Sequence, residues 1–208
     1  MIKKFSKERY GLPYLVSEPA VGLERWPLLC FLHGRGEAAP VDIEAALTRH
    51  GPLKDSSSAQ VTKFIVIAPQ LQSPGGDVWL RYADALQKMV QALPNVDPSR
   101  RYLTGFSFGG DGVLDIAPQQ VGFWAALWAV DPTRGPQAPA PQPIWLSAGE
   151  CARPHEAAFR RVLDTKPRSG GEAANFVYED RHLKHVATAA AAYADDKPYK
   201  WLLSKRLE

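Results

Sequence analysis

Runs of consecutive apolar residues recur along the chain and predict strands that are buried on both faces. They occupy residues 14–16, 27–32, 64–68, 101–106, 123–130, 144–147 and 174–178, and the first of them is weak. The strands of a parallel sheet that is covered on both sides read as continuous apolar stretches, whereas half-exposed strands alternate with polar residues. The pattern therefore indicates a mostly parallel sheet.

Amphipathic segments separate these runs and predict helices. Residues 84–93 place apolar side chains at i, i+3, i+4 and i+7, which is one face of a helix. Further helices are expected at 107–117, 155–163 and 188–203, the last with a break at Pro198. The alternation of strand and helix predicts a single α/β domain over residues 1–208, with helices on both faces of the sheet.

Composition and charge narrow the classes of partner. The net charge is only +3 over 208 residues, with acids and bases interspersed, so no nucleic-acid partner is expected. No apolar run approaches the ~20 residues of a membrane span, and no apolar stretch of a signal peptide follows the basic residues 1–10. Cys30 and Cys151 have neither disulfide-framework nor zinc-site spacing, which favours reduced thiols, a cytoplasmic protein and no bound metal.

The segment 105–109 reads Gly-Phe-Ser-Phe-Gly and fits the pattern G-x-S-x-G between a predicted strand and a predicted helix. In that context the serine lies on a sharp, strained turn, and the glycines flank it because side chains there would collide. The N-terminus of the following helix favours negative charge beside the serine. Ser107 is therefore the candidate nucleophile.

A glycine-rich loop, His33–Glu37, follows the strand at 27–32. Acyl transfer needs two backbone N–H donors for the oxyanion: one from the residue after the nucleophile, and one from such a loop. We assign them to Phe108 and Arg35, with Gly36 as an alternative to Arg35. His33 lies before the nucleophile and beside this loop, and is interpreted as a structural residue.

Three motifs, LHGRGE at 32–37, RHGPLK at 49–54 and GFSFGGDGVLDIA at 105–117, resemble those of α/β-hydrolases of the phospholipase/carboxylesterase-like and predicted-peptidase type. Dienelactone-hydrolase-like and polyhydroxybutyrate-depolymerase-like esterases are near relations. In this family the strand–turn–helix segment around the nucleophile, called the nucleophile elbow, reads G-L-S-M-G-G-Y-G-x-W-D-L-A. Its matches here are Gly105, Ser107, Gly109, Gly110, Gly112, Asp115 and Ala117. The resemblance covers residues 27–205 and implies an α/β-hydrolase fold without indicating a particular substrate.

The catalytic base should follow the last strand, because the triad order in this fold is nucleophile, acid, histidine. Two histidines satisfy this order, His182 and His185. The resemblance places the base just before the closing helix, which favours His185 and leaves His182 as the alternative. His50 and His155 are interpreted as surface residues.

The resemblance also implies an aspartate at position 152, where this chain has Ala152. Glu150 is the first choice of replacement, because residues i and i+2 of an extended segment face the same way. Asp131, at the end of the fourth long apolar run, is the main alternative. Glu156 is a weaker one, and the remaining alternative is that no acid contacts the base.

These residues predict a serine hydrolase that acts on small-molecule carboxylic esters with small acyl groups through an acyl-enzyme, with no cofactor and no metal. The proline-rich stretch 132–143 is short, so no large cap is expected. The alternative is a catalytically impaired homologue that binds an ester-like ligand or a partner, since the usual aspartate is replaced by Ala152.

Overall fold

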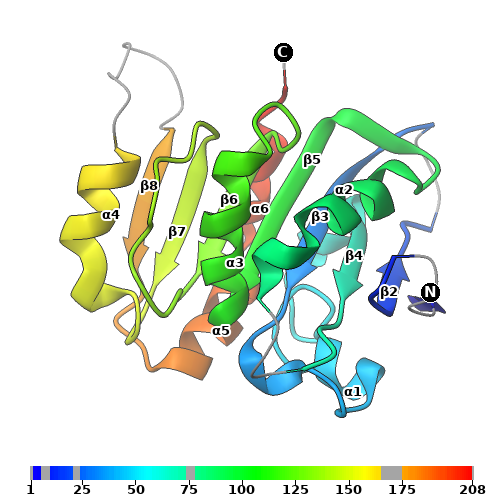
Figure 1. The fold of residues 1–208 in the computed structure, drawn as a ribbon, viewed down its shortest axis with the longest axis horizontal. Coiled ribbons are helices and arrows are strands. Elements are labelled where there is room, and N and C mark those ends of the chain that lie inside the picture. Colours follow the sequence, from blue (N-terminus) through cyan, green and yellow to red (C-terminus); the bar gives the residue numbers. More distant parts are fainter. Residues whose placement is uncertain (1, 6–9, 21–23, 74–77, 165–174, 208) are drawn as a thin grey trace.

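An eight-stranded sheet forms the centre of the molecule in the computed structural model, which describes residues 2–5, 10–20, 24–73, 78–164 and 175–207 (Figure 1). The strands are β1 (Ile2–Phe5), β2 (Tyr14–Ser17), β3 (Trp26–Leu32), β4 (Ile65–Pro69), β5 (Val96–Phe106), β6 (Ala126–Val130), β7 (Ile144–Ala148) and β8 (Phe176–Asp180). Their order across the sheet is β1-β2-β4-β3-β5-β6-β7-β8. Strands β3 to β8 are parallel, and β1 and β2 are antiparallel.

Each predicted strand is present, and one further strand, β1, was not predicted. All four residues of β1 are exposed, and β1 pairs only with β2 at the edge of the sheet. A short edge strand that buries none of its side chains has no apolar run or clear alternation to reveal it.

Six α-helices cover the sheet: α1 (Ile43–Leu47), α2 (Ala83–Gln91), α3 (Phe108–Ile116), α4 (Glu156–Leu163), α5 (His185–Ala194) and α6 (Asp196–Leu203) among the described residues. Helices α2, α3 and α4 lie on one face of the sheet, and α5 and α6 lie on the other (Figure 1). The apolar residues of α1 join the core beneath α5 and α6.

Alternate residues of the central strands contribute to two separate cores. In β3, Leu28, Cys30 and Leu32 pack beneath α2, α3 and α4. Leu29 and Phe31 belong to the core beneath α5 and α6. Because both faces are buried, nearly every position of such a strand is apolar, which explains the continuous runs in the sequence.

The closing helix is broken at a different residue from the predicted one. The break lies at Asp195, whose side chain accepts a hydrogen bond from the backbone N–H of Lys197 at 2.9 Å and caps α6. Pro198 lies inside the first turn of α6. Proline is tolerated there because its missing N–H would have no partner within the helix.

The carboxyl ends of the parallel strands meet at one edge of the sheet, the lower edge in Figure 1. The loops that leave this edge contain the candidate residues 33–37, 107, 131, 149–152 and 182–185. Between β6 and β7, residues 131–143 form no helix or strand. No helix within the described ranges is long and apolar enough to cross a membrane.

Candidate active site

Ser107 joins β5 to α3 in a strained backbone conformation. Its φ and ψ are 57° and −121°, a region that residues with a side chain rarely adopt, at a cost of about 1–3 kcal/mol. The turn is held by hydrogen bonds on both sides: the Ser107 N–H donates to the Val130 carbonyl at 2.9 Å, and the Asp111 N–H donates to the Ser107 carbonyl at 3.0 Å.

The two glycines of the pentapeptide are required sterically. A Cβ added to Gly105 would lie 2.2 Å from the carbonyl oxygen of Gly109. A Cβ on Gly109 would lie 1.9 Å from the carbonyl oxygen of Leu32, at the end of β3. These distances agree with the steric reason for the G-x-S-x-G pattern.

His185, the first residue of α5, lies between Ser107 and Asp131. Its Nε2 is 2.8 Å from Ser107 Oγ, and its Nδ1 is 2.6 Å from Asp131 Oδ2. The ring packs against Phe106, with 4.7 Å between the ring centroids. Side chains from the ends of β5 and β6 and from the start of α5 therefore form one continuous chain of hydrogen bonds.

Asp131 is fully buried, and its carboxylate is supported by backbone donors. Oδ1 accepts hydrogen bonds from the N–H groups of Gly149 and Ala152, at 2.8 and 2.9 Å. Oδ2 accepts the bond from His185. A buried carboxylate is tolerable only when its oxygens are satisfied in this way.

Glu150 was our first choice of acid, and the structure does not place it against the imidazole. Its exposed carboxylate accepts a hydrogen bond from Lys184 Nζ at 2.7 Å and a longer one from the backbone N–H of His185 at 3.3 Å. The hydrogen bond from Lys184 is the main reason why the pKa of Glu150 is lowered.

The segment after β7 is not extended, as a contact between Glu150 and the imidazole would require, but turns. Ala152 has helical φ and ψ of −77° and −32°, and the Arg153 N–H donates to the Gly149 carbonyl at 3.0 Å. In a turn, residues i and i+2 no longer face the same side. Glu156, the weaker alternative, forms an ion pair with Arg160 along α4.

Ala152, the position where the resemblance implies an aspartate, is buried and donates its N–H to Asp131. The carboxylate therefore occupies the space beside position 152, but it comes from the end of the neighbouring strand. A local signal existed in the sequence, since Asp131 directly follows the completely buried strand β6.

Of the two candidate bases, only His185 contacts Ser107. The side chain of His182 is 81% exposed, and its Nδ1 lies 3.6 Å from Asp180. The residue has a positive φ of 53°, in a loop that directs its side chain to solvent.

The loop after β3 lies against the serine. A Cβ on Gly34 would be 3.4 Å from Ser107 Cβ, and Arg35–Glu37 form a single 3-10 turn directly after Gly34. The Arg35 guanidinium lies over the ring of Phe108, 5.1 Å from its centroid. The structure thus brings together the two residues to which the oxyanion donors were assigned.

His33 is a structural residue, as expected. It is buried, its Nδ1–H donates to the Gly34 carbonyl at 2.5 Å, and its Nε2 accepts the N–H of Leu71 at 3.0 Å. Burial lowers the pKa of His33 to about 4. A neutral ring is the form that can make both hydrogen bonds.

The interpretation of His50 as a surface residue was wrong. Its ring packs edge-on against Phe106 at 5.5 Å, and its Nε2 lies 3.8 Å from Oε1 of the buried Glu37. Burial raises the pKa of Glu37. Glu37 and His50 belong to the sequence motifs at 32–37 and 49–54, but only the structure shows that His50 packs against Phe106, as His185 does. His155 is half-buried and directly precedes α4.

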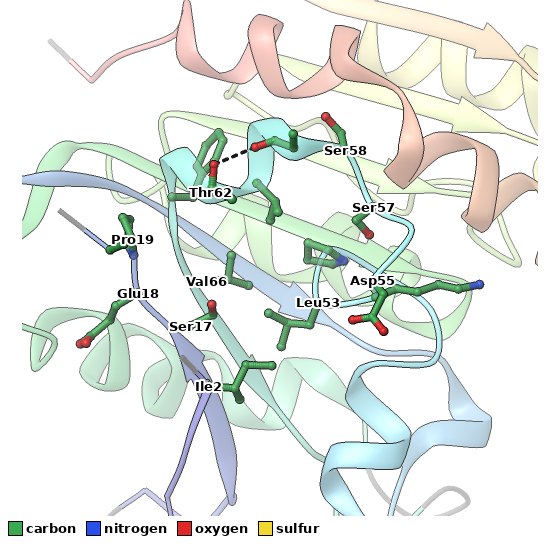
Figure 2. Close-up of a pocket in the computed structure, with 16 residues that line it drawn as sticks. Ile2, Ser17, Glu18, Pro19, Leu53, Asp55, Ser57, Ser58, Thr62 and Val66 are labelled. Atoms are coloured by element: carbon green, nitrogen blue, oxygen red, sulfur yellow. Dashed lines mark hydrogen bonds between the residues drawn. The ribbon is translucent and has the colours of Figure 1, made fainter. Parts of the chain in front are cut away.

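A separate cavity of about 550 Å³ lies between the strands β1 and β2, at the side of the sheet away from Ser107, and residues 52–66 (Figure 2). Three of its hydroxyl side chains already form hydrogen bonds within the protein. Ser57 donates to the Gly51 carbonyl, Ser58 donates to Asp196, and Thr62 donates to the Ala59 carbonyl. None of the residues of the Ser107 site lines this cavity.

Comparisons with known proteins give similarity at the level of structure. No protein-family model matches the chain, and no curated protein matches it in sequence. A thermostable esterase superposes with a TM-score of 0.69 at 19% identity, over 99% of this chain and 63% of that one. The chain therefore spans less than two thirds of that esterase.

Two other solved structures are similar over most of their length. An S-formylglutathione hydrolase from Staphylococcus aureus has a TM-score of 0.69 at 13% identity, covering 98% of both chains. The feruloyl esterase module from Clostridium thermocellum has a TM-score of 0.66 at 12% identity, covering 96% of this chain and 87% of that one. These likenesses, with the sheet order and the strand–serine–helix turn, confirm the predicted α/β-hydrolase fold.

Proposed function

We propose that the protein is a serine hydrolase that cleaves carboxylic esters with small acyl groups through an acyl-enzyme on Ser107. The observation that carries the proposal is the hydrogen-bonded chain from Ser107 through His185 to Asp131, with distances of 2.8 and 2.6 Å. A serine, an imidazole and a buried carboxylate in this order form a catalytic triad.

The roles follow from the hydrogen bonds. Asp131 accepts the Nδ1–H of His185, which leaves the lone pair of Nε2 directed at the serine hydroxyl. When Ser107 Oγ attacks the ester carbonyl, its proton moves to Nε2, and Asp131 stabilises the imidazolium that results. His185 then protonates the departing alkoxide, and the acyl group remains on Oγ.

Hydrolysis of the acyl-enzyme repeats the sequence with water. His185 removes a proton from the water as its oxygen attacks the acyl carbonyl, and it returns the proton to Ser107 Oγ as the carboxylic acid leaves. In both steps the carbonyl oxygen becomes negative. We assign its stabilisation to the backbone N–H groups of Phe108 and Arg35, with the N-terminus of α3 beside them.

Two further observations support hydrolysis of carboxylic esters at an uncovered serine. The segment between β6 and β7 forms no helix or strand that would cover the serine. Proteins of similar fold are described as an esterase, an S-formylglutathione hydrolase and a feruloyl esterase, all of which transfer acyl groups to water. We also propose a cytoplasmic location, on the basis of the free thiols Cys30 and Cys151.

The alternative of an impaired homologue depended on the missing aspartate at position 152. Asp131 supplies a carboxylate beside that position, so no observation now favours the alternative.

Hydrolysis of p-nitrophenyl acetate and butyrate tests the proposal, with Ser107→Ala as the matched variant. We expect turnover by the wild-type protein and loss of turnover in Ser107→Ala to the background rate. A fluorophosphonate should label the wild type and not the variant, because labelling requires an activated serine. Equal rates for the two proteins on both esters, together with no labelling, would overturn it.

A further inference from the structure

A third potential metal ligand lies beside the His185–Asp131 pair. The sulfur of Cys151, a ring nitrogen of His185 and a carboxylate oxygen of Asp131 all lie within 4.8 Å of one another. Thiolate, imidazole and carboxylate are the side-chain ligands that zinc uses in proteins, and three protein ligands leave a fourth position for water.

We propose that a thiophilic divalent cation such as Zn²⁺ binds to Asp131, Cys151 and His185 and reversibly inhibits the serine hydrolase. The geometry of these three side chains is the evidence for the binding site. The inhibition also depends on the proposed function of Ser107 as the nucleophile.

The geometry needs only small movements to accept the ion. Ligands at about 2.0–2.3 Å in a tetrahedral arrangement lie roughly 3.3–3.8 Å from each other. The Cys151 sulfur must therefore approach by up to about 1 Å, which a half-exposed side chain on a turn can do by rotating about χ1. His185 Nδ1 and Asp131 Oδ2, at 2.6 Å, must separate by a similar amount.

The electrostatic environment favours a cation. Asp131 supplies a buried carboxylate to the cluster, and Cys151 supplies a second negative charge once its thiol loses its proton on metal binding. Two anionic ligands balance the charge of a divalent cation at this position.

The protein cannot bind the metal and catalyse at the same time, because the two require different tautomers of His185. In the active form Nδ1 carries the proton and Nε2 accepts from Ser107. When Nδ1 binds the metal, the ring proton moves to Nε2, and the Cys151 thiol releases its proton to solvent. Nε2–H can no longer accept the serine proton, and the Asp131–His185 hydrogen bond is lost, so Ser107 is no longer activated.

The 208-residue protein is titrated with Zn²⁺ while the hydrolysis of p-nitrophenyl acetate is followed. Each rate is normalised to the metal-free rate of the same protein. Co²⁺ replaces Zn²⁺ in a parallel absorption measurement, because ligation by sulfur gives a thiolate-to-cobalt charge-transfer band that does not depend on activity. Cys151→Ala is the test variant. His182→Ala is the control, since it removes a nearby exposed histidine outside the cluster.

We expect Zn²⁺ to inhibit the wild type and EDTA to restore its rate. Cys151→Ala should need at least about tenfold more Zn²⁺ for half-inhibition, since changes around metal ligands alone weaken binding by that factor. The charge-transfer band should appear in the wild type and in His182→Ala and be absent from Cys151→Ala.

The outcomes separate the two proposals. A charge-transfer band and tight Zn²⁺ binding in a wild type without esterase activity would uphold the metal site and overturn the proposed function. Equal inhibition of the wild type and Cys151→Ala, or no Cys151-dependent band, would overturn the metal site while leaving the hydrolase unaffected.

Discussion

At the residue scale, the carboxylate partner of His185 is the feature that most needs a direct test. Asp131 Oδ2 lies 2.6 Å from Nδ1, whereas the Glu150 carboxylate contacts Lys184 and the backbone N–H of the same histidine. Glu150 is exposed and Asp131 is fully buried. The two acids are therefore expected to differ sharply in their effect on catalysis.

Asp131→Asn should lower kcat on p-nitrophenyl acetate by about 10⁴, the effect of the equivalent change in a serine protease, because an amide no longer fixes the tautomer of the imidazole. Glu150→Gln should change kcat by less than about threefold, since an exposed ion pair contributes little. Steady-state kinetics of the two variants give the comparison, with circular dichroism as a check on folding. A larger loss in Glu150→Gln than in Asp131→Asn would show that our assignment of the acid is wrong.

The nucleophile could be identified from sequence, and the acid could not, for a physical reason. The constraints on Ser107 are local: two glycines within two residues and a turn between a strand and a helix. The environment of Asp131 is assembled from residues 18 to 54 positions away, on the loop after β7 and at the start of α5. The turn at 149–152, which removes Glu150 from consideration, also has no clear signature in the sequence.

At the scale of elements, the packing of α3 against β3 depends on the absence of side chains. Gly109 lies in the first turn of α3, and its missing Cβ lets the backbone at Leu32 approach closely. The same contact brings the end of β3, and thus the loop 33–37, next to Ser107. Stability and the geometry of the site are linked at this contact.

Gly109→Ala should destabilise the protein by about 3 kcal/mol or more, because a Cβ 1.9 Å from the Leu32 carbonyl oxygen forces two backbones apart. Gly36→Ala is the matched control: no atom lies within 4 Å of its added Cβ, and its effect should stay within about 0.5 kcal/mol. Unfolding in urea measures both. Similar stabilities for the two variants would contradict the steric role of Gly109.

Strands that are buried on both faces were the most predictable elements. Runs such as 27–32 and 144–147 correspond to β3 and β7 within one residue at each end, because burial on both sides leaves little room for polar residues. The exposed strand β1 and the five-residue helix α1 lack such a signature. The helix break was assigned to Pro198 instead of Asp195 because a capping aspartate is a weaker signal than a proline.

At the scale of the whole molecule, the order and direction of the strands determine where the site forms. Neighbouring strands β3, β5, β6 and β7 are parallel, so the loops after their carboxyl ends converge on one edge. His33 stabilises part of this edge, because it joins the loop after β3 to Leu71, which follows β4. Its two hydrogen bonds require a neutral ring, which makes the stability of the fold sensitive to acid.

The free energy of unfolding should fall as the pH is lowered from about 6.5 towards about 4, the ordinary pKa of histidine and the pKa of buried His33. Above this range His33 is neutral in both the folded and the unfolded chain and contributes no pH dependence. Within it the unfolded chain binds a proton that the folded protein does not. The full loss is about 3 kcal/mol, from a difference of about 2.5 pKa units.

His33→Gln isolates this contribution, since glutamine can still accept the Leu71 N–H but does not titrate. Urea unfolding between pH 7 and pH 4.5 should show a shallower decline for the variant than for the wild type. Glu37 titrates in the opposite sense, because its raised pKa makes the folded protein bind a proton before the unfolded chain does. That effect is present in both proteins and cancels in their difference. If the free energy of unfolding fell equally with pH in both proteins, His33 would be protonated in the folded state at no cost. Its hydrogen bond with Leu71 would then not stabilise the loops at the carboxyl ends of the strands.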